Sequence, residues 1–414
     1  MSEEDRVKIR KLPTGVPGLD EILGGGLPEY SFNIIAGAPG GGKTTLAHQI
    51  AFGNATPKSP ALYFTVLGEP ALKMLRYQQQ FRFFDPAKLN TAVRFINLSQ
   101  VVLEKDLDAV LGEIVREVEA VSPGLVVVDS FRTVVRKAGG GTGDVELQGF
   151  VQRLALHLTS WQATTFLIGE YTEGEIRDNP VFTVADGLFW LYQQVERNSI
   201  VRKLQVMKLR GQASVPGLHT FRITEDGVQA FPRTIGLTGR TKKTRERRRL
   251  STGVAELDAM MSGGIPEGDS LLVAGASGTG KSVIATQFIA EGLRRGEPGI
   301  VAIFEERPDE YVGRAASLGM DFDTPQHNGK LEVLYLRPLD LSVDEAVREV
   351  LDAVERTGAK RVAIDSLTGF EMALAPSFRT DFRESLYRMI GALTRIGVTI
   401  VSTVEVSSRS PNCR

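Results

Sequence analysis

A repeated sequence unit is the feature that most restricts how this chain can fold. Residues 37–44 read GAPGGGKT and residues 275–282 read GASGTGKS, which places Lys43 and Lys281 238 positions apart. The segments 12–29 and 250–267 align without gaps at the same offset. Self-similarity at a fixed, long spacing marks a duplicated structural unit, so the two halves are expected to share one fold.

Each half alternates short apolar runs with helical patterns. Apolar, β-branched-rich runs lie at 31–37, 61–66 and 125–129, with counterparts in the second half. Because these runs lack polar alternation and are separated by helical segments, they predict a mostly parallel sheet with helices on both faces. The predicted fold class is α/β, with two tandem phosphate-loop (P-loop) domains.

Chain length and the repeat together predict the domain boundaries. A chain of 414 residues is too long for one ordinary core, so we expect a first domain at 1–232, a basic linker at 233–249 and a second domain at 250–414. The linker is interpreted as a solvated segment, with a docking site for an acidic partner or nucleic acid as the alternative.

The end of the first half has no counterpart in the second. Residues 186–211 predict two paired strands around a turn at Glu196–Asn198. The second repeat stops before the equivalent point, so its domain is expected to be C-terminally incomplete. Residues 407–414 match nothing in the first repeat, and a frameshift, a fragment or a true divergence would explain them.

Both glycine-rich stretches fit the pattern of a phosphate-binding loop between a strand and a helix. Backbone N–H groups of such a loop converge on phosphate oxygens, and the helix N-terminus adds a favourable dipole. The loop lysines, Lys43 and Lys281, would reach the β- and γ-phosphates of ATP and act in catalysis. The candidate nucleotide-binding residues are Gly37, Gly40, Gly41, Gly42, Lys43, Thr44 and Thr45 in the first loop and Gly278, Thr279, Gly280, Lys281 and Ser282 in the second.

Hydroxyl and carboxylate side chains in each half suggest a Mg²⁺ site. Thr44 and Ser282 follow the loop lysines directly and would ligate the ion. Asp129 and Asp365 end apolar runs 86 and 84 residues after those lysines, a placement that suits an acid holding Mg²⁺ through water. An aspartate in this position can also cap a helix or a turn.

An adjacent pair of acids is the candidate catalytic group. Glu305 and Glu306 follow the apolar run 299–304 and could orient or deprotonate the attacking water. The alternative is ordinary surface charge. The first half has Leu67 and Gly68 at the equivalent positions, so we expect its site to bind ATP and hydrolyse it slowly.

The combination of TGVPGLDEILGGGLPE at 14–29, FEERP at 304–308 and KLRG at 208–211 with the two loops resembles the KaiC family. These are tandem RecA-like ATPases of circadian-clock and related systems, and the resemblance covers nearly the whole chain. It implies two RecA-like domains, a homo-oligomer built as a hexameric double ring with ATP between subunits, and clock- or signalling-type protein partners.

The resemblance also assigns roles to individual residues. The K-x-R-G element of the family reaches the neighbouring subunit's ATP, which makes Lys208 and Arg210 candidate trans-acting phosphate contacts. Without the resemblance, the segment that contains them could be a solvent-facing strand with ordinary basic residues. The family's second domain also phosphorylates its own serine and threonine residues. Because the counterpart of those acceptors would follow Arg414, this autokinase activity is expected to be weakened here.

Two other functions stay open beside an ATPase. A RecA-like DNA-handling protein is suggested by the basic, glycine-rich segment 132–144. A catalytically weak, nucleotide-gated scaffold is suggested by Leu67 and Gly68. The near-balance of 49 basic and 50 acidic residues argues against a dedicated nucleic-acid binder.

Targeting signals and cysteine content bear on location. The start MSEEDRVKIRK lacks the apolar region of a signal peptide, and the apolar runs are too short to span a membrane. The single cysteine, Cys413, cannot form an internal disulfide. We therefore expect a cytoplasmic protein without a membrane anchor.

Overall fold

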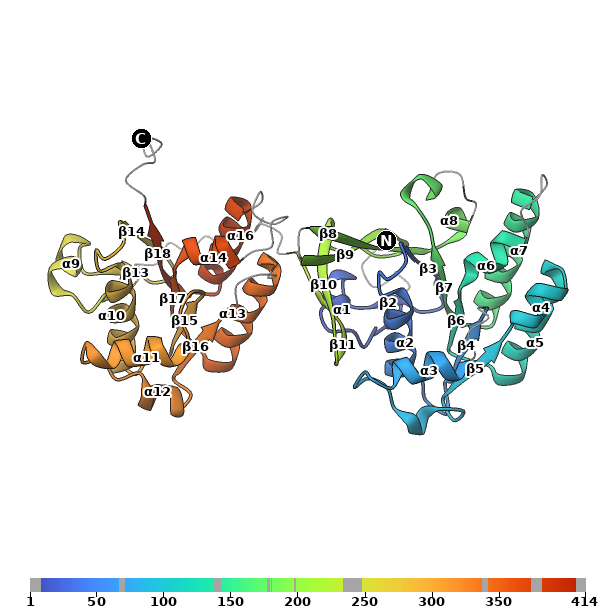
Figure 1. Ribbon diagram of the computed structural model, residues 1–414, viewed down its shortest axis with the longest axis horizontal. Coiled ribbons are helices and arrows are strands. Elements are labelled where there is room, and N and C mark those ends of the chain that lie inside the picture. Colours follow the sequence, from blue (N-terminus) through green and yellow to red (C-terminus); the bar gives the residue numbers. More distant parts are fainter. Residues whose placement is uncertain are drawn as a thin grey trace, which may run out of the picture. The chain divides into compact units, whose positions relative to one another are not determined.

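The computed structural model describes residues 9–66, 71–137, 143–176, 179, 181–196, 199–233, 248–336, 342–373 and 382–406. The chain divides into two compact units, one formed by residues 1–194 and 202–233 and the other by residues 195–201 and 234–414. Each unit is built around its own sheet (Figure 1).

The first unit contains a nine-stranded sheet in the order β11-β10-β9-β8-β3-β7-β6-β4-β5. The strands from β8 to β5 pair in parallel, whereas β9, β10 and β11 pair antiparallel. A separate antiparallel pair, β1 with β2, precedes it. The strand bounds are β1 Lys11–Leu12, β2 Leu27–Pro28, β3 Phe32–Gly37, β4 Ala61–Thr65, β5 Val93–Asn97, β6 Leu125–Asp129, β7 Thr164–Glu170, β8 Gly187–Glu196, β9 Ser199–Leu209, β10 Leu218–Thr224 and β11 Gly227–Phe231.

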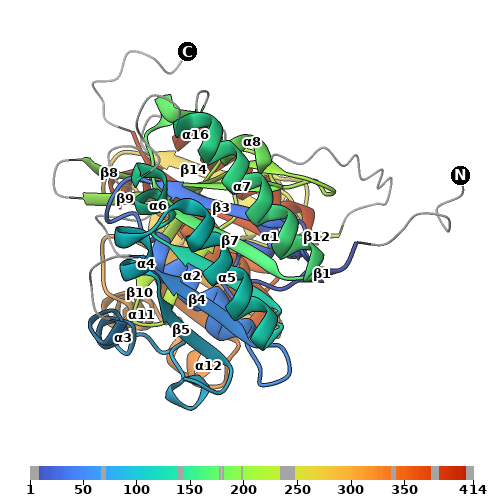
Figure 2. The same cartoon turned by 90° about the vertical axis from the view of Figure 1, so that its right-hand side faces the viewer.

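Helices cover both faces of this sheet, as Figure 1 shows and as Figure 2 shows from the side of α5 and α7. Neighbouring strand residues point to opposite faces: Ile34 packs in the core beneath α5 and α7, and Ile35 in the core beneath α1 and α2. This is the packing expected of an apolar strand without polar alternation. The helix bounds are α1 Leu19–Ile22, α2 Lys43–Asn54, α3 Ala71–Gln78, α4 Ser99–Glu104, α5 Leu107–Val121, α6 Phe131–Lys137, α7 Gly143–Ser160 and α8 Val181–Val184, with short 3₁₀ turns at Pro86–Lys88 and Glu173–Ile176.

The second unit repeats the parallel part of this arrangement. Its larger sheet has five parallel strands in the order β14-β18-β17-β15-β16, and β12 and β13 form a separate antiparallel pair. Its cores lie beneath α13, α14 and α16 on one face and beneath α10 and α11 on the other. The bounds are β12 Arg249–Leu250, β13 Ile265–Pro266, β14 Ser270–Gly275, β15 Gly299–Ile303, β16 Leu331–Tyr335, β17 Arg361–Asp365, β18 Thr399–Glu405, α9 Ala255–Met260, α10 Lys281–Arg294, α11 Pro308–Ser317, α12 Asp323–His327, α13 Val343–Thr357, α14 Leu367–Ala373 and α16 Phe382–Arg395. The predicted fold class, tandem α/β units with mostly parallel sheets, is confirmed.

The two repeats differ at the strand that enters the glycine loop. In the first unit β3 is buried along its whole length, because β7 pairs with one edge and β8 with the other. In the second unit β14 pairs with β18 alone among the strands the structure describes, and Leu272 at its centre is 58% exposed. Nothing in the described part of the second unit corresponds to β8–β11.

Several predicted features lie outside the described residues. These are Leu67 and Gly68, most of the basic linker (234–247), the centre of the basic glycine-rich segment (138–142), the turn residues 197–198 and the C-terminal residues 407–414. The predicted paired strands on either side of that turn are present as β8 and β9, which are neighbours in the sheet. None of the helices in the described ranges combines the length and apolarity needed to cross a bilayer.

Candidate functional site

Each glycine-rich loop joins a parallel strand to a helix that begins at the loop lysine. In the first unit the loop follows β3, and α2 starts at Lys43 after Gly42, whose φ is +90°. In the second unit the loop follows β14, and α10 starts at Lys281 after Gly280, whose φ is +88°. Only glycine adopts this conformation without strain, which explains its presence immediately before each helix.

Gly37 must be glycine for a further reason. Its φ is +145°, and a Cβ atom at this position would lie 2.1 Å from the Leu191 carbonyl oxygen of the adjacent strand β8. The first loop therefore leaves its sheet in contact with β8. The equivalent Gly275 has an ordinary φ, and the atom nearest to an added Cβ belongs to the Thr279 side chain.

The loop lysines donate to carbonyl groups of their own loops. Lys43 Nζ lies 3.1 Å from the Gly37 oxygen and 2.7 Å from the Ala38 oxygen, and Lys281 Nζ lies 2.7 Å from the Ala276 oxygen. Lys43 is 7% exposed, and burial lowers its pKa, an effect opposed by the negative charges of Glu170 and Asp129. A phosphate at the loop would offer this ammonium group a charged acceptor in place of neutral carbonyls.

In both units a hydroxyl at the start of the helix donates to an aspartate at the end of a strand. The Thr44 hydroxyl lies 2.8 Å from Asp129 Oδ2, and the Ser282 hydroxyl lies 3.1 Å from Asp365 Oδ1. The sequence predicted these four residues together, and the structure brings each pair into contact across more than 80 residues.

This donor set fits Mg²⁺. The ion prefers hard oxygen ligands and is usually held by one or two carboxylates together with substrate phosphates. No cluster of three or more histidine, cysteine, aspartate or glutamate side chains suited to a metal occurs in the described part of the chain. The two hydroxyl–carboxylate pairs could hold the ion, with phosphate oxygens and water completing its shell.

Around Asp129 the first site has a second hydroxyl donor that the sequence did not reveal. The Tyr63 hydroxyl lies 2.8 Å from Asp129 Oδ2, and the Tyr63 ring stacks on His48 with ring centres 4.3 Å apart. Burial raises the pKa of Asp129, while the hydrogen bonds from Thr44 and Tyr63 and the charge of Lys43 act in the opposite direction. Tyr63 lies in the interior of an apolar strand, where a tyrosine is typical of core packing.

His48 makes the first unit sensitive to acid. Its ring is fully buried, Nδ1 lies 2.9 Å from the Thr44 carbonyl oxygen, and burial lowers its pKa to about 3. The unfolded chain binds this proton near pH 6.5. Between pH 6.5 and 3 the unfolded state therefore holds a proton that the folded state lacks, and stability falls by about 1.4 kcal/mol per pH unit as the pH decreases.

We expect His48→Thr to reduce this pH dependence, because threonine carries no group that titrates in this range. Threonine is the natural choice, since it occupies the equivalent position, Thr286, of the second unit. The measurement is the urea midpoint of the first-unit transition between pH 7 and pH 4.5 for both chains. The substitution also removes the stacked ring, so the absolute stability will fall, but the slope against pH is independent of that loss. Equal slopes would show that His48 does not control the acid response.

The second site surrounds its aspartate differently. Asp365 Oδ1 accepts from the Thr403 hydroxyl at 2.5 Å as well as from Ser282, and Arg314 Nη2 lies 4.0 Å from Asp365 Oδ2. Arg314 also forms an ion pair with Glu306. Neither Thr403 nor Arg314 was predicted from the sequence, because they lie on β18 and α11, away from any loop motif.

A cavity of about 410 Å³ opens at the first loop. Five of the seven first-loop candidates line it, together with Asp129 and residues from β7, β10 and the segment after β6. Glu170 ends β7 and lines this cavity, a position the sequence could have suggested because it too is an acid that follows an apolar run. The lining residues are Gly40, Gly42, Lys43, Thr44, Thr45, Asp129, Ser130, Arg132, Thr133, Ile168, Gly169, Glu170 and Ile223.

The K-x-R-G residues lie at the end of β9 and directly after it, and neither is among the residues that line this cavity. Lys208 Nζ lies 3.1 Å from the Thr183 carbonyl oxygen, and Arg210 Nη1 lies 3.1 Å from Asp186 Oδ1. The Arg210 side chain is 60% exposed, whereas Lys208 is half-buried.

Two glycine loops, each between a parallel strand and the helix it feeds, place the chain in the class of tandem P-loop proteins with α/β domains. A family model described as the KaiC ATPase matches residues 12–235 and 250–413. The chain belongs to the KaiC ATPase family.

Individual relatives agree with this assignment. The chain is 29% identical over 374 residues to circadian clock oscillator protein KaiC 1 of Synechocystis sp. (strain PCC 6803), which covers 88% of this chain and 71% of the relative. It is 30% identical over 370 residues to circadian clock oscillator protein KaiC of Rippkaea orientalis, which covers 87% of this chain and 70% of the relative.

Proposed function

We propose that this chain is a Mg²⁺-dependent ATPase that binds ATP at both loops and hydrolyses it mainly at the second. The observation that carries the proposal is the pair of hydroxyl–aspartate contacts, Thr44 with Asp129 and Ser282 with Asp365, each beside a glycine loop at a helix start. Two copies of one strand–loop–helix–aspartate arrangement are far more specific than a single loop.

We assign phosphate binding, Mg²⁺ binding and water activation to different residues. Loop amides and the lysine bind the β- and γ-phosphates, while the hydroxyl and the aspartate hold Mg²⁺. When bound, Mg²⁺ neutralises charge on the phosphate oxygens. In the second site Glu305 and Glu306, the acids that follow β15, would orient a water and accept its proton as the oxygen attacks the γ-phosphorus and the bond to the bridging oxygen breaks.

We also propose a homo-oligomer in which Lys208 and Arg210 of one subunit reach the ATP of its neighbour. This proposal is supported by family membership, by the exposure of Arg210, and by the position of both residues at the end of β9, away from the first loop's own cavity. A hexameric ring is the arrangement proposed, with clock- or signalling-type proteins as partners. Autophosphorylation is a separate activity, which transfer of labelled phosphate to the chain would reveal.

Calorimetry with Mg²⁺ and a non-hydrolysable ATP analogue tests the binding sites one by one. We expect two sites in the wild type, one in Lys43→Ala, one in Lys281→Ala and none in the double variant, with each loss at least about tenfold in affinity because a charged phosphate contact disappears. Size measurement with and without Mg·ATP tests the oligomer. A wild type that retains no nucleotide with both lysines intact would contradict the proposal.

A DNA-handling function is the second candidate, suggested by the basic segment 132–144. Arg132 is part of this segment, lines the first cavity and forms an ion pair of 2.7 Å with Glu175, so it is already engaged within its own unit. Salt-dependent binding of single-stranded DNA, weakened by substitution of Arg136 and Lys137, would favour this function over the one proposed.

A further inference from the structure

Arg314, on α11, connects the charged groups of the second site. Its Nη2 forms an ion pair with the Glu306 carboxylate, and its Nε lies 3.4 Å from Glu306 Oε2. The same Nη2 lies 4.0 Å from Asp365 Oδ2. One guanidinium group thus faces two carboxylates of the site.

A chain of contacts fixes this guanidinium in place. It lies over the Tyr311 ring, 4.7 Å from the ring centre. Tyr311 is fully buried, and its hydroxyl lies 2.8 Å from the Thr286 hydroxyl, which in turn donates to the Ser282 carbonyl oxygen at 2.7 Å. The position of Arg314 is therefore coupled to the first turns of α10, the helix that begins at the loop lysine.

The neighbouring acid, Glu305, lies elsewhere. A Cβ atom added at Gly369 would be 2.8 Å from Glu305 Oε1, so this carboxylate rests against the backbone of α14. No hydrogen bond or ion pair joins Glu305 to another side chain within the described ranges, whereas Glu306 is held at α11. Two acids that are adjacent in sequence are thus separated in space and in electrostatic environment.

The first repeat has an arginine at the position of Arg314 but lacks its acidic partner, so the exposure of the two arginines can be compared. Arg76 is the residue equivalent to Arg314, and Gly68 stands where Glu306 would be. Arg76 is exposed, while the Arg314 side chain is 32% exposed. The arginine thus turns toward its site only in the repeat that has the two acids, although both repeats have an arginine at this helix position.

We propose that Arg314 is a positioning residue of the second site: it holds Glu306 at α11, offsets the charge of the carboxylates, and leaves Glu305 as the acid that acts on the attacking water. Arginine suits this role because its fork matches a carboxylate and its charge is permanent. The inference rests on the proposed ATPase function and assigns different tasks to the two acids of that site.

The test uses the full chain carrying Lys43→Ala, so that only the second loop turns over ATP. We expect Arg314→Ala to lower kcat about tenfold with KM within about twofold, because Arg314 acts through Glu306 and does not touch the nucleotide. Glu306→Gln should give a similar loss, and the double variant should be no slower than the slower single variant. Arg314→Lys should restore part of the rate, since it keeps the charge without the fork.

Calorimetry with Mg²⁺ and the non-hydrolysable analogue supplies the readout that is independent of turnover. All four variants should bind the analogue within about twofold of the Lys43→Ala parent. Three results would overturn the role of Arg314 without affecting the ATPase proposal. These are a kcat loss in the double variant equal to the product of the two single losses, an unchanged kcat in Arg314→Ala, and loss of analogue binding in Arg314→Ala. A Lys43→Ala parent that binds no analogue would overturn the ATPase proposal, and this inference with it.

Discussion

Glu305→Gln is expected to slow phosphate release from the second site by about 100-fold or more. Positioned general bases contribute on this scale, and glutamine keeps the shape of the side chain while removing its ability to accept a proton. The measurement is single-turnover phosphate release in the Lys43→Ala chain, in which the first loop is silenced. Because the amide is isosteric, binding of the nucleotide should be retained.

Glu306→Gln is the matched control, since it makes the same chemical change one residue further along. Its loss should be about tenfold, because Glu306 is already occupied by Arg314. Equal losses at the two positions would contradict the division of tasks between them. A Glu305→Gln/Glu306→Gln chain that releases phosphate as fast as its parent would favour the nucleotide-gated scaffold over an enzyme.

Arg361→Leu is expected to lower the free energy of unfolding of the second unit by about 3–5 kcal/mol. Arg361 is fully buried, its Nε lies 2.8 Å from Glu297 Oε2, and its Nη1 lies 2.7 Å from the Ser251 carbonyl oxygen. Its guanidinium also stacks on Phe288, 4.6 Å from the ring centre. Glu297 also pairs with the exposed Arg248, so Arg361→Leu takes away the buried one of its two guanidinium partners. Removing the buried partner of a largely buried carboxylate is the costly way to break such a pair.

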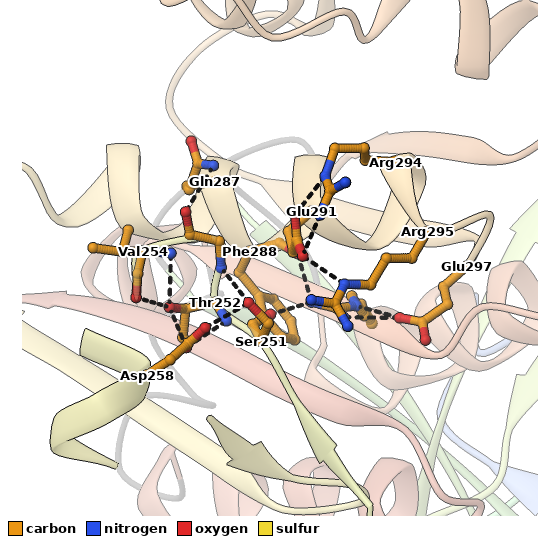
Figure 3. Close-up of polar contacts among 12 residues, drawn as sticks. Ser251, Thr252, Val254, Asp258, Gln287, Phe288, Glu291, Arg294, Arg295 and Glu297 are labelled. Carbon is orange, nitrogen blue, oxygen red and sulfur yellow. Dashed lines mark hydrogen bonds and ion pairs between the residues drawn. The ribbon is translucent and has the colours of Figure 1, made fainter. Parts of the chain in front are cut away.

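Figure 3 shows Glu297 near a second charged group, in which Glu291 forms ion pairs with Arg294 and Arg295. Urea unfolding followed by circular dichroism measures the effect.

The first repeat supplies the control for this prediction. It has Leu125 and Ser59 at the positions of Arg361 and Glu297, so the two repeats differ at both partners together. The double variant Arg361→Leu/Glu297→Ser should therefore be more stable than Arg361→Leu alone, because it also removes the carboxylate that has lost its buried partner and keeps only the exposed Arg248. A single variant as stable as the wild type, or a double variant less stable than the single one, would show that the pair is not what holds these elements together.

The site was predictable from the sequence where it depends on local motifs. The loop residues before each helix and the aspartates at the ends of β6 and β17 follow from spacing and apolar runs, because adjacent parallel strands deliver their carboxyl ends to one edge of the sheet. Tyr63, Thr403 and Arg314 were not predictable in this way. Each reaches the site from a strand interior or a helix face, and only the packing of distant segments decides which of many such side chains points inward.

The sequence by itself determined the duplication, the α/β class, the two loops and the pairing of hydroxyl with aspartate, because these depend on periodicity, glycine conformation and strand polarity within each repeat. The tertiary structure alone decided which distant side chains surround the aspartate in each copy. Tyr63, on which His48 stacks, contacts the first aspartate, whereas Thr403 and Arg314 contact the second. Arg361 forms a buried ion pair with Glu297, whereas the equivalent residue of the first unit, Leu125, belongs to an apolar core. These differences arise from contacts between residues far apart in the chain, whose partners become defined only when the sheet and its helices have packed.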